Sequence, residues 1–337
     1  MITPLHDCLG RATRSGQPRR AGRRVGRRVG RRFSLALCVA LVLAGAGCTT
    51  LRPSDPTGAP APTEPLRVMT FNIRYGTAPD GEDAWPRRRE LVFRVIGSFA
   101  PTLLGVQEAL RFQLDEIGSN RPEYEETGVA RDDGAEQGEY SAILYDRRRL
   151  ELLVHGTFWL SDTPHLPGSR SWGNNFARIV TWGRFRDRVT GAAFYAFNTH
   201  WDHESQPSRE RSAALLLERI DARATPDPVL LMGDFNAGED NPAFQALLAP
   251  RDEPNATVRL YDTFRAVHPR ARDTGTYHAF TGDRTGARID AILASPEWHT
   301  HGAAIITFGE NGRFPSDHFP VTATVALSAA PATSPGP

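Results

Sequence analysis

Polar side chains end a series of apolar segments in this chain. The segment V-L-L-M-G-D-F-N carries Asp234 and Asn236 at its end. An apolar run of this kind is typical of a strand buried on both faces, and strand side chains repeat every second residue. Both polar groups are therefore expected at one edge of a sheet. Other apolar segments carry an amide, carboxylate or imidazole near one end in the same way, namely Asn72, Glu108, His200, Asp290 and the pair Asp317 and His318.

Oxygen donors dominate this set of side chains, which suits Mg²⁺ or Mn²⁺ better than structural zinc. Such a metal neutralises phosphoryl oxygens and the charge that develops on a leaving group. Histidines beside carboxylates orient or deprotonate a water, or stabilise the anion of the transition state. Each residue alone has an ordinary explanation as a turn or helix-cap residue. Their combination predicts metal-assisted hydrolysis of a phosphoester.

Charge is divided unevenly along the 337 residues, and all 40 basic residues are arginines. The first 47 residues hold ten arginines and one acid, so the remainder carries 30 basic against 38 acidic residues. A mature domain with this acidic balance is a poor fit to long polyanions, whose binding depends on basic phosphate contacts. We therefore expect a phosphorylated small molecule as substrate, with nucleic acid disfavoured.

The N-terminus has the pattern of an export signal. A basic region ends at Arg31 and Arg32, an apolar stretch follows at 33–47, and G-A-G-C at 45–48 resembles a lipoprotein processing site. We predict a signal peptide at 1–48 with Cys48 as the lipidated residue, which makes a lipid anchor the protein's contact with the membrane. The alternative is a plain secretory signal cut nearby, which leaves the protein secreted or periplasmic. With Cys48 as the last cysteine, the mature domain has no internal disulfide.

Composition divides the rest into a linker, one domain and a tail. Residues 49–65 are rich in Pro, Thr and Ala, the folded domain is expected at 66–328, and a disordered tail is expected at 329–337. Apolar periodicity predicts helices after Pro86, after Glu108 and after Ser205, with a short one near 242–249. Strands are predicted near 66–72, 102–107, 140–145, 150–160, 178–186, 192–199, 229–236, 287–294, 303–308 and 319–326. These are too many strands for one sheet, so two packed sheets with outer helices are expected in an α/β protein that we take to be a monomer.

Several motifs in order resemble the endonuclease/exonuclease/phosphatase (DNase I-like) superfamily. They are T-F-N-I-R at 70–74, G-V-Q-E at 105–108, E-Y-S-A-I-L-Y at 139–145, N-T-H at 198–200, G-D-F-N at 233–236, R-I-D at 288–290 and S-D-H-F-P-V at 316–321. The resemblance covers nearly all of 66–326 and is closest to bacterial exported members of undefined substrate. It implies a four-layered α/β/β/α sandwich of two packed mixed sheets flanked by helices, with the site at one end.

The resemblance also implies roles for the metal and the attacking water. Glu108 would be the principal metal ligand with Asn72 beside it, and Asp317 would complete the metal site. Asp234 would align or activate the water, and Asn236 would orient the water or the phosphate. The metal implied is Mg²⁺ or Mn²⁺.

A second group of residues is implied to contact the phosphate. His318, paired with Asp290, would contact the scissile phosphate, and His200 and Tyr140 would contact the phosphate or leaving group. The general base is left open between Asp234 and the pair of His318 with Asp290, because such sites titrate as coupled units. Tyr140 has an alternative explanation, since tyrosine is a good strand residue.

Four further residues are candidates for binding substrate. His203 and His278 are expected at the substrate rim. Arg178 either faces phosphate or is a strand-face charge. Trp85 either stacks on a sugar or base ring or fills the core beneath a polar loop that caps the next helix.

The leading functional prediction is an exported Mg²⁺- or Mn²⁺-dependent phosphoesterase. Its substrate would be a small or medium phosphorylated compound, such as a sugar, inositol or nucleotide phosphate. A first alternative is a secreted nuclease, which predicts arginines clustered around the site despite the acidic total. A second alternative is a surface lipoprotein that keeps the fold for binding without catalysis.

Overall fold

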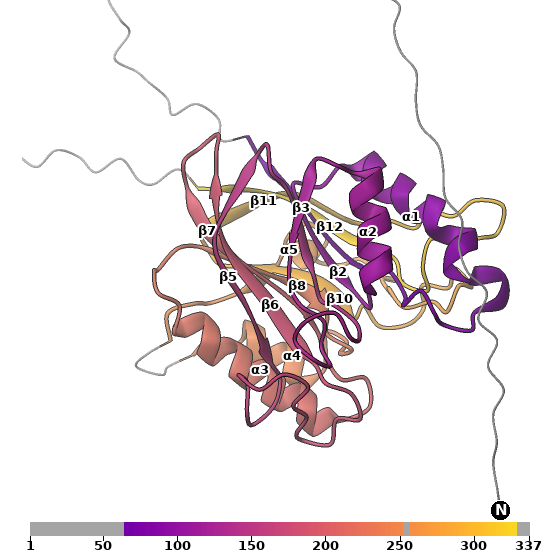
Figure 1. Ribbon diagram of the computed structural model, residues 1–337. Helices are drawn as coiled ribbons and strands as arrows, with labels where there is room; N and C mark the ends of the chain where they lie inside the picture. The colour runs from indigo at the N-terminus through magenta and orange to yellow at the C-terminus, as the bar shows by residue number, and fades with distance from the viewer. Residues whose placement is uncertain (1–63, 252–255, 329–337) are drawn as a thin grey trace, which may run out of the picture. The chain divides into compact units, whose positions relative to one another are not determined.

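Two six-stranded sheets form the framework of the domain (Figure 1). The structure is a computed structural model that describes residues 64–251 and 256–328. The predicted signal peptide at 1–48, nearly all of the linker at 49–65 and the tail at 329–337 lie outside the described residues. Among the described residues, no helix has both the length and the apolar character needed to cross a membrane.

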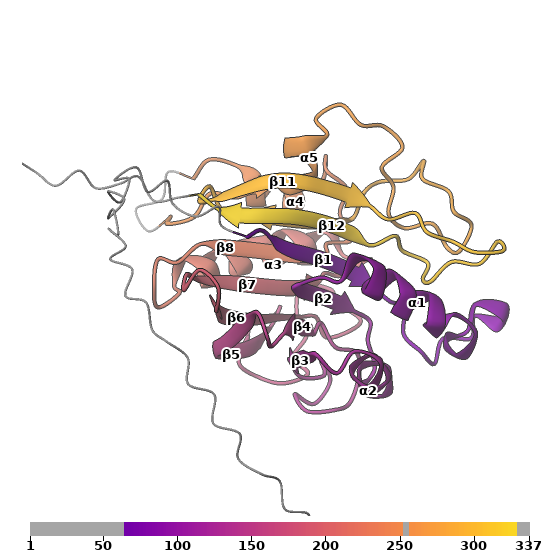
Figure 2. The ribbon, with the colours of Figure 1, turned by 90° about the horizontal axis from the view of Figure 1, so that it is seen from above.

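The first sheet combines strands from both ends of the domain. Figure 2 shows β11, β12 and β1 side by side. Its strand order is β11 (Trp298–Ile305), β12 (Val321–Leu327), β1 (Leu66–Asn72), β2 (Leu103–Gln107), β4 (Ile143–Asp146) and β3 (Tyr124–Thr127). Strands β1 and β2 are parallel, and the other neighbours pair antiparallel.

The second sheet is built from the middle of the chain. Its order is β5 (Leu150–Trp159), β6 (Ile179–Asp187), β7 (Ala193–His200), β8 (Val229–Asp234), β10 (Asp290–Ala294) and β9 (Tyr261–Asp262). Strands β7 and β8 are parallel, and the remaining pairs are antiparallel. The helical elements are η1 (Gly81–Asp83), α1 (Trp85–Phe99), α2 (Arg111–Asn120), α3 (Gln206–Asp221), α4 (Pro242–Leu248) and α5 (Thr263–Val267).

Alternation along the buried strands explains the layers. In β8, Leu230 and Met232 belong to the core between the two sheets, whereas Leu231 belongs to the core beneath α3 and α4. In β1, Val68 faces the other sheet and Met69 packs in the core that includes α1 and α2. Since each central strand buries both faces, its sequence is almost continuously apolar. The predicted four-layered α/β/β/α sandwich is confirmed, with helices outside two packed sheets (Figure 1).

A buried polar contact joins the two sheets. Asn198 of β7 donates through Nδ2 to the carbonyls of Val106 and Ala142, at 2.9 and 2.8 Å, across the inter-sheet core. Gln107 Nε2 donates to Asn198 Oδ1 at 2.6 Å. A Cβ at Gly105 would lie 2.7 Å from Asn198 Oδ1, so this position favours glycine. Buried amides of this kind need such partners, and here they hold β7 against β2.

Differences from the predicted elements fall at polar or short segments. The edge strand β3 has the sequence Y-E-E-T with two exposed glutamates, and it lacks the apolar pattern that identifies a strand. Strand β9 has two residues and α5 has five, both too short for periodicity to detect. The strand predicted near 303–308 is β11, which begins earlier at Trp298 and ends at Ile305.

Candidate active site

Strand register brings three of the predicted site residues together. In the parallel pair β7–β8, His200 lies opposite Asp234. In the antiparallel pair β8–β10, Asp290 lies opposite the same Asp234. Three residues that are far apart in sequence therefore occupy neighbouring positions across one sheet, with Asp234 at the centre.

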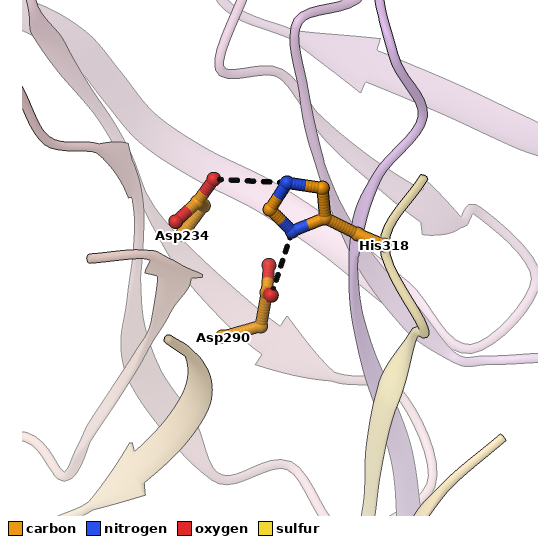
Figure 3. A group of neighbouring side chains, drawn as sticks. All are labelled: Asp234, Asp290 and His318. Atoms are coloured by element: carbon orange, nitrogen blue, oxygen red, sulfur yellow. Dashed lines mark hydrogen bonds and ion pairs between the residues drawn. The ribbon is translucent and has the colours of Figure 1, made fainter. Parts of the chain in front are cut away.

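His318 lies between two of these carboxylates (Figure 3). Its Nδ1 is 2.9 Å from Asp290 Oδ2, and its Nε2 is 3.9 Å from Asp234 Oδ2. His200 Nε2 approaches Asp234 from another side at 3.5 Å. All four side chains are buried. The arrangement holds one imidazole between two carboxylates and places a second imidazole beside Asp234.

The other sheet contributes Asn72 and Glu108 from the ends of β1 and β2. Asn72 Nδ2 donates to Glu108 Oε1 at 3.1 Å and to Asp234 Oδ2 at 3.0 Å. Asn72 Oδ1 accepts the backbone N–H of Arg74 at 3.0 Å. Because the amide nitrogen faces the carboxylates, Asn72 connects Glu108 to Asp234 in this structure and does not present a metal-binding oxygen. The predicted ligand role of Asn72 stays a prediction.

Four of these residues, Glu108, His200, Asp234 and His318, line one pocket of about 650 Å³. Asp317 joins them from the loop before β12, with Oδ2 3.8 Å from Arg74 Nε. Glu108 and His318 both line this pocket, so the predicted convergence of the two sheets at one site is present. The lining is Arg74, Tyr75, Glu108, Arg131, Glu139, Phe176, Arg178, His200, His203, Asp234, Asn236, Tyr277, Ile289, Asp317 and His318.

Left-handed backbone conformations position several of these side chains. Glu108 has φ 60°, Asn236 has φ 46° and Arg74 has φ 57°. Non-glycine residues adopt such angles at a cost, and they cluster at functional sites. Strand β8 ends at Asp234. Asn236 is therefore positioned by a turn and not by the strand alternation that was predicted for 229–236. In that turn Asn236 N donates to Asp234 Oδ1 at 2.9 Å, and Nδ2 donates to the carbonyl of Trp201 at 3.0 Å.

Burial and neighbouring charges shift the pKa values of Asp234, His318 and His200 away from their usual values. Burial, reinforced by Asp290, raises the pKa of Asp234 to about 7. Burial alone would lower the pKa of His318, but Asp290 and Asp234 outweigh it and hold that pKa well above its usual value. Burial and the nearby Arg178 lower the pKa of His200 well below its usual value. Near neutral pH the two imidazoles therefore differ, with His318 cationic and His200 neutral.

The donor set fits a hard divalent cation. Glu108, Asp234 and Asp317 present carboxylates to one pocket, and burial raises the pKa of Asp317. Asp234, Asp290 and His318 each place one donor atom within 4.8 Å of the others. Asp290 does not line the pocket and instead holds His318 Nδ1, so we assign this trio to proton chemistry. Glu108 and Asp317 line the pocket and would be the residues to hold a cation, since their oxygens suit Mg²⁺ or Mn²⁺.

Arg178 and His203 are two predicted substrate-binding residues that lie close together. Both line the pocket, and Arg178 Nη2 is 2.9 Å from His203 Nδ1. Arg178 Nε and Nη1 are buried and make no hydrogen bond within the described part of the chain. The nearest acid is Asp202, at 3.6 Å from Nε. A buried guanidinium with free donors beside a pocket is suited to an anionic ligand.

Three residues that were candidates for contacting substrate lie outside the lining of this pocket. The Tyr140 hydroxyl donates to the carbonyl of Ala135 at 2.8 Å, and the side chain is buried outside the pocket lining. His278 is buried and stacks on Phe319 at 3.8 Å between ring centroids. Trp85 is 2% exposed and packs in the core beneath α1, with Nε1 donating to Glu116. Trp85 thus takes the core alternative that the sequence allowed, and all three side chains are buried.

Several lining residues were not predicted. Arg74 follows the Asn72 turn, and Glu139 directly precedes Tyr140 in a motif that the sequence analysis identified. Tyr277 is adjacent to His278 and is half exposed at the pocket. Alternation in this extended segment places Tyr277 outward and His278 inward, so the residue that lines the pocket is the neighbour of the one predicted. Arg131 and Phe176 lie in irregular loops and carry no recognisable signal.

Comparison with known proteins gives one family match. A family model described as the endonuclease/exonuclease/phosphatase family matches residues 69–318. A solved endonuclease/exonuclease/phosphatase from Bacteroides vulgatus is 30% identical with a TM-score of 0.72, and the match covers 78% of this chain and 99% of that chain. A mannosyl-6-phosphatase from Bacteroides thetaiotaomicron is 30% identical with a TM-score of 0.69, covering 78% and 100% respectively. An uncharacterized protein of Acanthamoeba polyphaga mimivirus is 29% identical over 212 residues, which are 60% of this chain and 76% of that protein.

Proposed function

The chain belongs to the endonuclease/exonuclease/phosphatase family, and from that premise we propose that it is an exported, divalent-metal-dependent hydrolase of small phosphoesters. The observation that carries this proposal is the meeting of Glu108, Asp317, Asp234 and His318 in one pocket. Glu108 and Asp317 supply carboxylates suited to a hard cation. Beside them lie the Asp234 carboxylate and the His318 imidazolium, which are suited to proton transfer. Export is supported by the basic and apolar N-terminal pattern that ends at Cys48.

Asp234 is suited to accept the proton of the attacking water. Its raised pKa of about 7 makes it a stronger base than an exposed aspartate and leaves it substantially ionised at neutral pH. Asn72 Nδ2 and the backbone N–H of Asn236 hold the two oxygens of this carboxylate in place. This environment favours Asp234 as the general base over the pair of His318 and Asp290.

His318 is suited to stabilise the phosphoryl group. Its cationic imidazole faces the pocket through Nε2, while Asp290 fixes the ring through Nδ1. A positioned cation of this kind stabilises negative charge that develops on phosphoryl oxygens. Asn236 in the same lining is placed to orient the water or the phosphate.

Glu108 and Asp317 would hold the metal, and the buried excess of carboxylates supports its binding. When bound, a Mg²⁺ or Mn²⁺ ion polarises phosphoryl oxygens and neutralises charge on the leaving group. Asn72 positions Glu108 through its Nδ2 contact. Arg74, whose pKa is raised through its hydrogen bond with Asp80, remains a fixed cation beside Asp317.

A sugar phosphate is the substrate class that the comparisons favour. The mannosyl-6-phosphatase is 30% identical to this chain, and its whole length is covered by the match. The pocket of about 650 Å³ is of the size that accepts a small molecule. We therefore place sugar phosphates ahead of inositol and nucleotide phosphates.

Arginines at the pocket support a nuclease as the second candidate. Arg74, Arg131 and Arg178 all line the pocket, as the nuclease alternative predicted. Arg74 is already paired with Asp80 at 2.9 Å, and Arg131 is paired with Glu139 at 2.6 Å. These pairs reduce the positive charge that a polynucleotide backbone requires, which leaves the small-molecule hydrolase as the stronger proposal.

A substrate panel with two site variants tests the proposal. Hexose, inositol and nucleoside phosphates, bis(p-nitrophenyl) phosphate and plasmid DNA are assayed with Mg²⁺, with Mn²⁺ and with a chelator. We expect turnover of a small phosphoester that requires the metal, and losses of at least about 10²-fold in Glu108→Ala and His318→Ala, the scale of removing one electrostatic or acid–base group.

Exposed residues of the same types provide the controls. Glu90 on α1 and His299 on β11 lie outside the pocket, so Glu90→Ala and His299→Ala are expected to keep wild-type turnover. Full activity in either site variant would contradict the proposed roles. Plasmid nicking that weakens steeply with salt would favour the nuclease. Ligand binding without turnover of any ester would favour a non-catalytic binding lipoprotein.

A further inference from the structure

Two exposed aromatic rings lie at the pocket that holds the catalytic groups. Six large apolar side chains of the described residues are at least 39% exposed, and two of them, Phe176 and Tyr277, line this pocket. Phe176 is 47% exposed and Tyr277 is 50% exposed. Large aromatic groups are normally buried, so two exposed rings at one concave site indicate a ligand that covers them.

Phe176 is held in place by polar neighbours. The Arg131 guanidinium lies 5.2 Å from the centre of its ring, and the His203 imidazole stacks on it at 6.3 Å with an interplanar angle of 24°. All three residues line the pocket. Phe176 is therefore a fixed apolar surface that remains open to the pocket, since nearly half of its side chain is exposed.

Tyr277 lies beside the phosphate-binding end of the same pocket. Its ring centre is 5.1 Å from that of His318, and its backbone forms a bridge with His318. A substrate whose phosphate reaches His318 therefore brings the group attached to that phosphate near Tyr277. The two rings lie beside different histidines, His318 and His203, and both rings line the same pocket.

Charged groups in the same pocket lining as Phe176 include both hydrogen-bond donors and hydrogen-bond acceptors. Arg131 donates to Glu139 through Nη1 and Nη2, at 2.6 and 2.9 Å, while its Nε has no hydrogen-bond partner among the described residues. Arg178 lines the same pocket, and its buried Nε and Nη1 make no hydrogen bond within the described residues. An ionised carboxylate is only an acceptor and a guanidinium is only a donor. A hydroxyl group satisfies both at once, because it donates to one partner and accepts from the other.

From these contacts we infer that Phe176 and Tyr277, with Arg131 and Glu139, form a subsite for the ring of a sugar phosphate. This inference rests on the proposed function and adds the residues that select the leaving group. A sugar ring offers apolar C–H faces to the two aromatic rings and hydroxyls to the charged pair. A nucleobase edge also offers donors and acceptors, so the choice of a sugar follows the similarity of this chain to a mannosyl-6-phosphatase.

Steady-state kinetics of Phe176→Ala and Tyr277→Ala test the subsite. The substrates are a hexose 6-phosphate, which carries a ring, and glycerol 3-phosphate, which has hydroxyls but no ring. We expect the KM for the hexose phosphate to rise about tenfold in each variant with kcat within about twofold, because the ring contact is lost in ground and transition states alike. The KM for glycerol phosphate is expected to change by less than about twofold, because it has no ring to lose.

Leu166→Ala is the matched control. Leu166 lies in the same connection between β5 and β6 as Phe176 and is 54% exposed, but it does not line the pocket. The inference is overturned if Phe176→Ala leaves the KM for the hexose phosphate unchanged. It is overturned equally if both substrates lose affinity alike, or if nucleoside monophosphates are the esters that lose affinity.

A binding measurement separates this inference from the proposed function. Calorimetry with a non-hydrolysable hexose 6-phosphonate reports on the subsite whether or not the protein turns over any ester. Weaker binding in Phe176→Ala, with no turnover of any ester by the wild type, would support the subsite and reject the hydrolase. Turnover of phosphoesters with equal phosphonate affinity in wild type and Phe176→Ala would reject the subsite and keep the hydrolase.

Discussion

Asp234 shows how neighbouring side chains set the chemistry of a single carboxylate. It lies between a cationic His318 and a neutral His200, and burial with Asp290 raises its pKa to about 7. The two imidazoles differ because Asp290 bonds to one of them, whereas burial and Arg178 act on the other. Two groups of the same type thus differ in protonation at one pH, which is the usual basis for assigning an acid and a base.

His278 gives a prediction at the same scale. Burial lowers its pKa from the ordinary 6.5 to about 4. Between these values the unfolded chain takes up a proton and the folded chain does not, so the free energy of unfolding falls as pH falls through that window. His278→Gln removes this proton uptake. Between pH 6.5 and 4 the variant should therefore lose about 1–2 kcal/mol less of its free energy of unfolding than the wild type does.

Urea denaturation at a series of pH values checks the effect of His278. His299→Gln, which removes an exposed imidazole, is the control and should follow the wild-type pH dependence. An unchanged slope in His278→Gln would show that His278 is not kept neutral by the fold.

At the scale of elements, Arg88 of α1 joins the loops that carry the site. It donates to the carbonyls of Ile73 at 2.7 Å, Arg74 at 3.0 Å and Pro315 at 2.9 Å, as well as to Asp83. It is 1% exposed, and burial lowers its pKa to about 10. Within the described part of the chain, the guanidinium forms no ion pair. These bonds attach α1 to the turn after β1 and to the loop before β12, which place Asn72 and Asp317.

Replacing Arg88 should therefore weaken both the fold and the site. In Arg88→Met the carbonyls lose their donor, and we expect the free energy of unfolding to fall by at least about 2 kcal/mol, together with a lower kcat. The adjacent Arg87→Met is the control, because Arg87 is exposed and pairs with Glu82 at the surface. Its expected change is below about 0.5 kcal/mol in urea denaturation. Equal stability of the two variants would contradict this role of Arg88.

At the scale of the whole molecule, the N-terminal pattern gives the protein a predicted location. A basic region, an apolar stretch and Cys48 precede an acidic domain. We expect the chain, expressed in a bacterium, to incorporate a labelled fatty acid and to fractionate with membranes. The Cys48→Ser variant should do neither, because the acyl acceptor is lost. Labelling of Cys48→Ser would place the anchor elsewhere, and absence of label in the wild type would favour the plain secretory signal.

Two packed sheets with outer helices could be predicted from sequence because the signals of their strands are local, and the four-layered arrangement followed from the resemblance to a known family. Apolar segments such as 229–234 are buried on both faces, so they stand out without knowledge of their neighbours. The motifs around Glu108, Asp234 and His318 could be located by the same local signals, because each lies near one end of an apolar segment. Local patterns could not identify β3 or β9, whose pairing depends on residues distant in the chain.

The sequence by itself determined which segments carry the chemical groups, and the tertiary structure decided which side chains reach the pocket. Asp234 lies between His200 and Asp290 because of strand register, which depends on the packing of whole sheets. The same packing buries His278 and Tyr140 and exposes Tyr277. The direction of a side chain depends on contacts from other elements. For this reason one of two adjacent residues is buried while the other is exposed at the pocket.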